Sequence, residues 1–261
     1  MSLQLRCKLS RTEQLVAIAA ALLISAGVTA KPSVPQTAAK LPSAQWVLDR
    51  NVEATGGKDA LLRHKSMTIH GRYQAPAQKL DVETVFYTKD GKLLLKAALP
   101  EGKEYATGFD GQTSWVLDPA GKVTIQQGDE VKSVARDADM YYHLHVMKYF
   151  KSFEVVDIQE FNGRACYHLK GLTNWDKPNE HFYDKENGLL LGYAFQGSIG
   201  PATETFEEYK DFGGVKMPAK TTSRDGDQMS LSLITAVTYD DVDDAVLALP
   251  GAVQKAKNQL K

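Results

Sequence analysis

The sequence is poor in cysteine, with two among its 261 residues. Cys7 lies in the basic start of the chain, which leaves Cys166 alone in the remainder. An internal disulfide is therefore excluded there, and the fold has to be stabilised by its hydrophobic core. Cys166 stands in the stretch ACYHL, which favours a small buried strand residue, with a thiolate nucleophile as the alternative.

The chain also lacks an apolar run long enough to span a membrane. Its longest run, Leu15–Val28, falls short of the ~20 residues that a spanning helix needs. Basic residues precede this run and small residues follow it, which is the pattern of a secretory signal peptide. We therefore expect a cleaved signal over residues 1–30, with the cut after Ala30, and export to a compartment such as the bacterial periplasm.

No charge of one sign dominates, because the formal net charge is −1 and no basic run is visible. Nucleic-acid binding depends on neutralising phosphates, so this composition argues against it. It argues equally against electrostatic docking on anionic lipid.

Catalytic and metal-binding motifs are missing as well. The sequence contains no nucleophile elbow, phosphate-binding loop, dinucleotide fingerprint, zinc-protease motif or EF-hand. His143 and His145 would lie about 200° apart on a helix, too far to share a metal easily. Asp137 and Asp139 suggest a helix cap more than an acid–base pair. We therefore expect no enzyme activity, no metal and no cofactor.

What the sequence has in abundance is hairpin signals. Asn-Gly, Asp-Gly and Gly-Gly pairs separate short alternating apolar runs along most of the chain, and such pairs are the strongest local indication of antiparallel hairpins. The predicted turns lie at residues 90–91, 110–111, 162–163, 186–188, 213–214 and 225–226. A meander of about a dozen strands has to curl rather than stay flat.

Helical signals are few. After a flexible leader over residues 31–42, a helix is predicted to begin at Ser43 and end at Gly56-Gly57, followed by a short helical turn. Residues 129–150 interrupt the meander and predict two helices that meet near Asp137–Asp139. We expect one β-rich domain over residues 43–250, with a short helix near its end and a polar tail over 251–261.

The faces of two strands follow from alternation. Trp115 would share a face with Thr113 and Leu117. The last strand predicts one apolar face, made of Met229, Leu231, Leu233, Val237 and Tyr239.

Five stretches resemble the family of periplasmic outer-membrane lipoprotein-sorting proteins, the LolA-like and LppX-type lipid carriers. In chain order they are EATGGKDALLRHKS, GFDGQTSW, DADMYYHL, FYDKENGLLLG and EEYKDFGGVKMPAK. The resemblance implies a mainly β (α+β) fold, an incomplete antiparallel β-barrel or strongly curved meander with helices as a lid over an apolar cavity. It supplies no ligand-binding motif to carry over.

These observations predict a carrier or binding protein for a lipid, lipoprotein acyl chains or a similar hydrophobic ligand, with an inner- or outer-membrane protein as a possible partner. The alternatives are an envelope sensor that acts through a protein partner, and an enzyme using Cys166 or a histidine. Alternation and size give the candidate cavity-lining residues, each of which could be core instead: Phe86, Leu95, Tyr105, Trp115, Tyr142, Met147, Tyr193 and Phe195.

Overall fold

A single antiparallel sheet of thirteen strands forms the body of the protein in a computed structural model that describes residues 40–259. The predicted signal peptide and most of the predicted leader lie outside the described residues. The strands are β1 (Ser66–Ala75), β2 (Leu80–Lys89), β3 (Lys92–Ala98), β4 (Glu104–Phe109), β5 (Ser114–Leu117), β6 (Val123–Ile125), β7 (Phe150–Phe161), β8 (Arg164–Thr173), β9 (Pro178–Asp184), β10 (Leu190–Gln196), β11 (Pro201–Phe212), β12 (Val215–Asp225) and β13 (Gln228–Tyr239).

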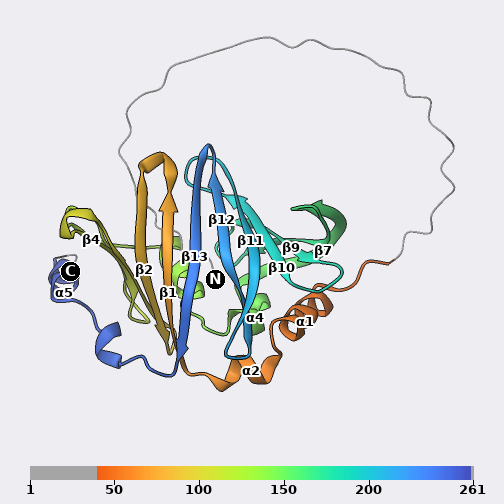
Figure 1. Cartoon of the computed structure of the whole chain (residues 1–261), viewed down its shortest axis with the longest axis horizontal. Coiled ribbons are helices and arrows are strands. Elements are labelled where there is room, and N and C mark those ends of the chain that lie inside the picture. The colour runs from red at the N-terminus through yellow and green to blue at the C-terminus, as the bar shows by residue number, and fades with distance from the viewer. Residues whose placement is uncertain (1–39, 260–261) are drawn as a thin grey trace, which may run out of the picture.

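The strand order joins two meanders. Strands β1 to β6 and β7 to β13 each run in sequence, and β1 pairs with β13 between them. Strands β6 and β7 end the sheet, so it curves without closing into a barrel (Figure 1). The predicted fold class, a strongly curved open meander, is confirmed.

The predicted turns explain this order. Asp90 and Gly91 have φ values of 49° and 69°, and Asn162 and Gly163 have 49° and 74°. Two successive residues with positive φ make the tight turn whose twist matches that of paired strands. These turns join β2 to β3 and β7 to β8 in register.

The helices lie on both faces of the sheet and at one end of it. They are α1 (Ala44–Ala54), α2 (Lys58–Arg63), α3 (Asp129–Asp137), α4 (Tyr142–His145) and α5 (Gly251–Asn258), with 3-10 turns η1 (Pro76–Gln78), η2 (Pro100–Gly102), η3 (Val146–Tyr149) and η4 (Asp244–Leu247). Ser43 caps α1 by accepting a hydrogen bond from the Trp46 N–H at 3.2 Å, as its position predicted.

The predicted insert forms a lid over the concave face. Helix α3 packs Val131, Val134 and Ala135 against the apolar residues of β1 to β4, and Ala138 beyond its end is fully buried there. Helix α1 and Val146 of η3 cover the other half of that face, on β7 to β11. We name α3, α4 and the turn between them the lid.

The C-terminal segment differs from the predicted polar tail. Residues Gly251–Asn258 form α5, and Val253 is 1% exposed. It packs with Trp115 and Leu94 on the convex face of the sheet, where Figure 1 shows α5 beside β4. The tail is amphipathic, and its few apolar positions were too sparse to predict a helix.

The face of β13 also corrects a prediction. His70 pairs with Ala236 and Gly71 with Ile234, so Thr235 is an extra residue that forms a β-bulge. A bulge exchanges the two faces of a strand on one side of it.

As a result, the apolar face predicted for β13 does not exist as one surface. Ser232 and Ile234 share the concave face with Val237 and Tyr239, because their partners on β1 alternate onto that face. Leu231 pairs with Gln74 and faces the other side.

Candidate ligand-binding cavity

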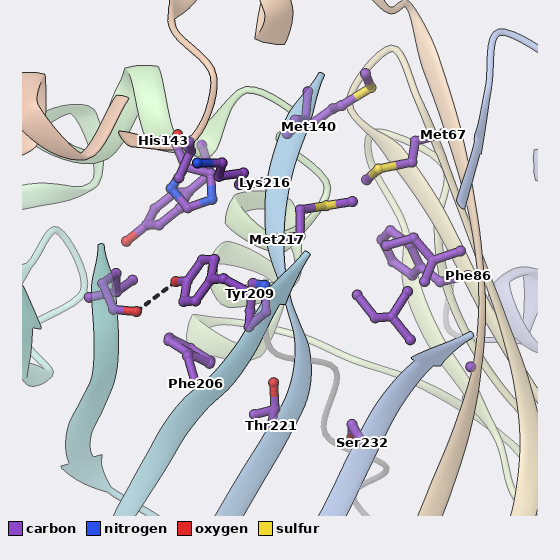
Figure 2. Close-up of a pocket in the computed structure, with 18 of the residues that line it drawn as sticks. Met67, Phe86, Met140, His143, Phe206, Tyr209, Lys216, Met217, Thr221 and Ser232 are labelled. Atoms are coloured by element: carbon purple, nitrogen blue, oxygen red, sulfur yellow. Dashed lines mark hydrogen bonds between the residues drawn. The ribbon is translucent and has the colours of Figure 1, made fainter. Parts of the chain in front are cut away.

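A cavity of about 130 Å³ lies between the concave face and the lid. Its wall comes from β1, β2, β3, β10, β11, β12 and β13, and its cover from α2 and the lid. Figure 2 shows side chains from these strands pointing toward one another across the open space. A cavity of this size in a protein interior can accept a benzene-sized apolar guest.

The middle of the cavity is apolar and adaptable. Met67, Phe86, Met140 and Met217 contribute thioethers and a ring (Figure 2), and Leu95 of β3 closes the wall behind them. Methionine side chains fit varied apolar shapes because they are unbranched and polarizable. This part of the cavity suits hydrocarbon and selects weakly among hydrocarbon shapes.

One end of the cavity is polar but uncharged. Tyr73, Thr84, Thr221 and Ser232 contribute hydroxyl groups from four strands. Thr221 pairs with Ser232 across β12 and β13, so these two side chains share the concave face.

The opposite end, which we name the rim, carries the ionisable groups of the cavity. These are His64 after α2, Asp139 and His143 of the lid, and Lys216 at the start of β12. Figure 2 draws His143 and Lys216 on the same side of the cavity. Burial lowers the pKa of His143 to about 4, so its ring is neutral at neutral pH.

Asp139 organises the lid at the rim. Its carboxylate accepts hydrogen bonds from the Tyr149 hydroxyl at 2.7 Å and the Tyr141 N–H at 3.0 Å, and it pairs with His145 Nδ1 at 2.8 Å. The helix cap predicted at Asp137 or Asp139 is not formed, because α4 begins after Tyr141 without a side-chain cap, and Asp139 instead closes the turn that precedes α4.

Half-buried tyrosines lie on the side of the cavity nearest α1, and Tyr142 and Tyr209 line its wall. The Tyr209 hydroxyl donates to the Leu190 carbonyl at 2.6 Å, the bond drawn in Figure 2. Burial raises the pKa of Tyr142 to about 12 and that of Tyr193 well above its ordinary value. These hydroxyls stay protonated and act as hydrogen-bond donors and acceptors only.

Of the eight residues predicted to line the cavity, three do so and five do not. Phe86, Leu95 and Tyr142 line the cavity. Tyr105 packs in the same apolar cluster as Phe86, and Tyr193 packs beside Tyr142, but neither reaches the cavity wall.

The remaining three predicted residues lie elsewhere. Trp115 is core on the convex face, because its partner Gly108 alternates with the concave-facing residues of β4. Met147 is 43% exposed on η3. Phe195 lies half-buried on β10, away from the cavity wall.

Sequence reasoning missed His64, Met140, Lys216 and Met217. Three of the stretches that carried the family resemblance hold these four residues, namely EATGGKDALLRHKS, DADMYYHL and EEYKDFGGVKMPAK. The fold brings the three stretches together at the rim. That convergence was the available signal, and reading each stretch only as turn and strand overlooked it.

The residues considered for catalysis are poorly placed for it. Cys166 is fully buried, and burial raises the pKa of its thiol to about 11, so it is not a thiolate at neutral pH. Within residues 40–259, no group of three or more histidine, cysteine or acidic side chains is arranged to hold a metal.

No protein-family model and no curated protein matches this sequence. Solved structures do resemble it. A LolA superfamily protein from Nitrosomonas europaea matches with a TM-score of 0.56 and 14% identity, over 80% of this chain and 99% of that one. This chain has the LolA fold.

Two further structures agree with that assignment. A DUF1329 family protein from Desulfovibrio piger matches with a TM-score of 0.57 and 14% identity, over 78% of this chain and 96% of that one. A putative outer membrane lipoprotein-sorting protein domain from Vibrio parahaemolyticus matches with a TM-score of 0.54 and 13% identity, over 77% and 94%. The fold implied by the five quoted stretches is confirmed.

Across the part of the chain that the structure describes, no helix is both long enough and apolar enough to cross a membrane.

Proposed function

We propose that this protein is an exported, non-catalytic carrier or binding protein for a lipid, lipoprotein acyl chains or a similar hydrophobic ligand. The observation that carries the proposal is the methionine- and aromatic-lined cavity between the concave face of a LolA fold and a helical lid. The predicted signal peptide supports a periplasmic location, and a donor or acceptor protein in the inner or outer membrane is the proposed partner.

The physical basis of binding is transfer of hydrocarbon out of water. Each buried CH₂ contributes ~0.8 kcal/mol, so an acyl chain of ordinary length supplies ample affinity without a strong polar contact. Release then requires exposure of the chain or an acceptor that is more apolar.

Entry of a long chain requires the lid to move, because the present cavity matches a guest no larger than a benzene ring. Polar contacts hold the lid to strand β2 and to the end of α2. The Thr88 hydroxyl donates to the Ala138 carbonyl at 3.2 Å, and the Tyr141 hydroxyl donates to the His64 carbonyl at 2.7 Å. Separation of the lid would break these bonds and enlarge the cavity.

A matched pair of substitutions tests where the ligand binds. Ser232→Phe fills the cavity from β13, whereas Leu231→Phe adds the same ring to the opposite face of that strand. We expect Ser232→Phe to weaken uptake of a fluorescent fatty acid by about tenfold or more, because it removes space for several CH₂ groups.

Leu231→Phe is the control and is expected to bind like the unmodified protein. Equal binding by both variants would contradict a ligand site on the concave face. A thermal unfolding midpoint measured for each variant separates lost binding from lost folding.

A further inference from the structure

His64 at the rim has one ring nitrogen in use and one without a partner. Its Nδ1 lies 3.0 Å from Asp240 Oδ2, and its side chain is 14% exposed. Its Nε2 is buried and forms no hydrogen bond with any described residue. A buried polar atom left unpaired costs free energy, so its presence at a cavity wall requires an explanation.

The ring is held in this orientation from several sides. Asp240 also accepts from the Ser66 N–H at 3.3 Å, and Tyr239 stacks on the imidazole at 3.8 Å between ring centroids. Asp240, whose side chain is 47% exposed, holds the ring at Nδ1, and His64 is one of the residues that line the cavity. His64 is therefore presented to the cavity as a fixed polar group.

Lys216 shares the rim with His64. The Tyr239 hydroxyl donates to the Phe212 carbonyl at 3.0 Å, and the Lys216 N–H donates to the Thr55 carbonyl at 2.9 Å. These bonds fix the β11–β12 turn against the ring that stacks on His64. The Lys216 side chain is exposed, and its ammonium forms no ion pair with any residue in the described range.

The acidic groups near the rim are already engaged. Asp240 pairs with His64 from the outer side, and Asp139 is occupied by Tyr149, His145 and the backbone of the lid. The positive charge of Lys216 is consequently not neutralised by either carboxylate. An ammonium on a flexible side chain and a fixed imidazole beside it can each donate a hydrogen bond to a negatively charged oxygen group.

We infer that the rim binds the anionic head group of a single-chain amphiphile, a carboxylate or a phosphate, with its alkyl chain in the methionine-lined part of the cavity. This inference rests on the proposed carrier function and adds the ligand class. His64 donates through Nε2 to one oxygen of the head group, while its Nδ1 stays paired with Asp240. Lys216 contacts a second oxygen.

Four probes with the same sixteen-carbon chain test this inference: palmitate, hexadecyl phosphate, hexadecanol and methyl palmitate. Their dissociation constants for the mature protein, residues 31–261, are measured by displacement of a fluorescent fatty acid below the micelle concentration. We expect the anionic probes to bind about tenfold or more tightly than the two neutral ones, as charge-assisted hydrogen bonds require. The ratio of palmitate to hexadecyl phosphate tells whether the site prefers a carboxylate or a phosphate.

Two variants assign the preference to the rim. Lys216→Met and His64→Phe each remove a donor, and phenylalanine preserves the stacking on Tyr239. Each variant is expected to weaken palmitate binding by about tenfold, while hexadecanol binding stays the same. Lys210→Met is the matched control, since Lys210 is an exposed lysine on the neighbouring strand that does not line the cavity. It is expected to leave both affinities unchanged.

The outcomes separate the two proposals. Equal binding of all four probes, unaffected by either rim variant, would overturn the head-group inference and leave the carrier function standing. Absence of binding by every probe would overturn both. If His64→Phe lowers the unfolding midpoint, Lys216→Met alone provides the measurement, because Lys216 is exposed and its substitution leaves the core intact.

Discussion

At the scale of single residues, His143 shows how burial decides chemistry. Its spacing from His145 argues against a shared metal site, and the two rings have different surroundings in the structure. His145 pairs with Asp139, whereas His143 lines the cavity and burial lowers its pKa to about 4. A neutral ring at the rim adds hydrogen-bonding capacity without adding charge.

This pKa predicts a dependence of stability on pH. The unfolded chain takes up a proton at His143 near its ordinary pKa of 6.5, and the folded protein does so only near 4. Stability present above pH 6.5 is therefore lost as the pH falls toward 4, with a contribution from this residue of roughly 1–3 kcal/mol.

Urea unfolding at pH 7, 6 and 5 measures the effect. The free energy of unfolding is expected to fall with pH less steeply in His143→Phe than in the unmodified protein. Parallel slopes for the two proteins would contradict a buried, neutral His143. The free energy of unfolding of His143→Phe is still expected to fall with pH, because burial also lowers the pKa of His181 well below its ordinary value.

At the scale of elements, the sequence predicted the tight turns correctly. It did not always predict which face of the sheet a strand residue occupies. The pairs Asp90-Gly91 and Asn162-Gly163 specify their turns locally. A tight hairpin turn needs two successive residues with positive φ, and these two pairs supply them. The bulge at Thr235 has no comparable local signature. It depends on pairing with β1, which is 160 or more positions away along the chain, so alternation alone assigned β13 to the wrong faces.

Helix α5 illustrates an element that only tertiary packing reveals, and it carries a prediction. Val253→Ala is expected to lower the free energy of unfolding by roughly 1–3 kcal/mol, because it leaves a cavity against Trp115. Ligand affinity is expected to stay unchanged, since α5 lies on the convex face. Val246→Ala is the control, because Val246 is 36% exposed.

Denaturant unfolding and the fluorescent fatty-acid assay together check that prediction. A loss of binding without a loss of stability would contradict the assignment of α5 to a purely structural role.

At the scale of the whole molecule, the sequence indicated a curved meander with a lid, and it could not define the cavity. Phe86 and Leu95 were predicted correctly as cavity-lining residues. Side-chain size and alternation were sufficient evidence there, because the two residues lie on adjacent strands near the middle of the sheet. Trp115 obeys the same local rules, but its pairing with Gly108 places it on the convex face, where α5 covers it. Which face of a curved sheet is concave depends on the full strand order.

The rim is also a property of the whole molecule. His64, Asp139 and Lys216 are brought together from three distant segments, and none has a local pattern that predicts a site. All three lie within the stretches quoted above, which therefore hold rim residues as well as turns.

Native mass spectrometry of the mature protein, residues 31–261, purified from the envelope of its own cells tests the carrier function most directly. We expect a species heavier than the polypeptide by about one equivalent of lipid, which organic solvent extracts and which Ser232→Phe fails to retain. A polypeptide mass without added lipid, from a protein that also takes up no fluorescent fatty acid, would contradict the proposed function.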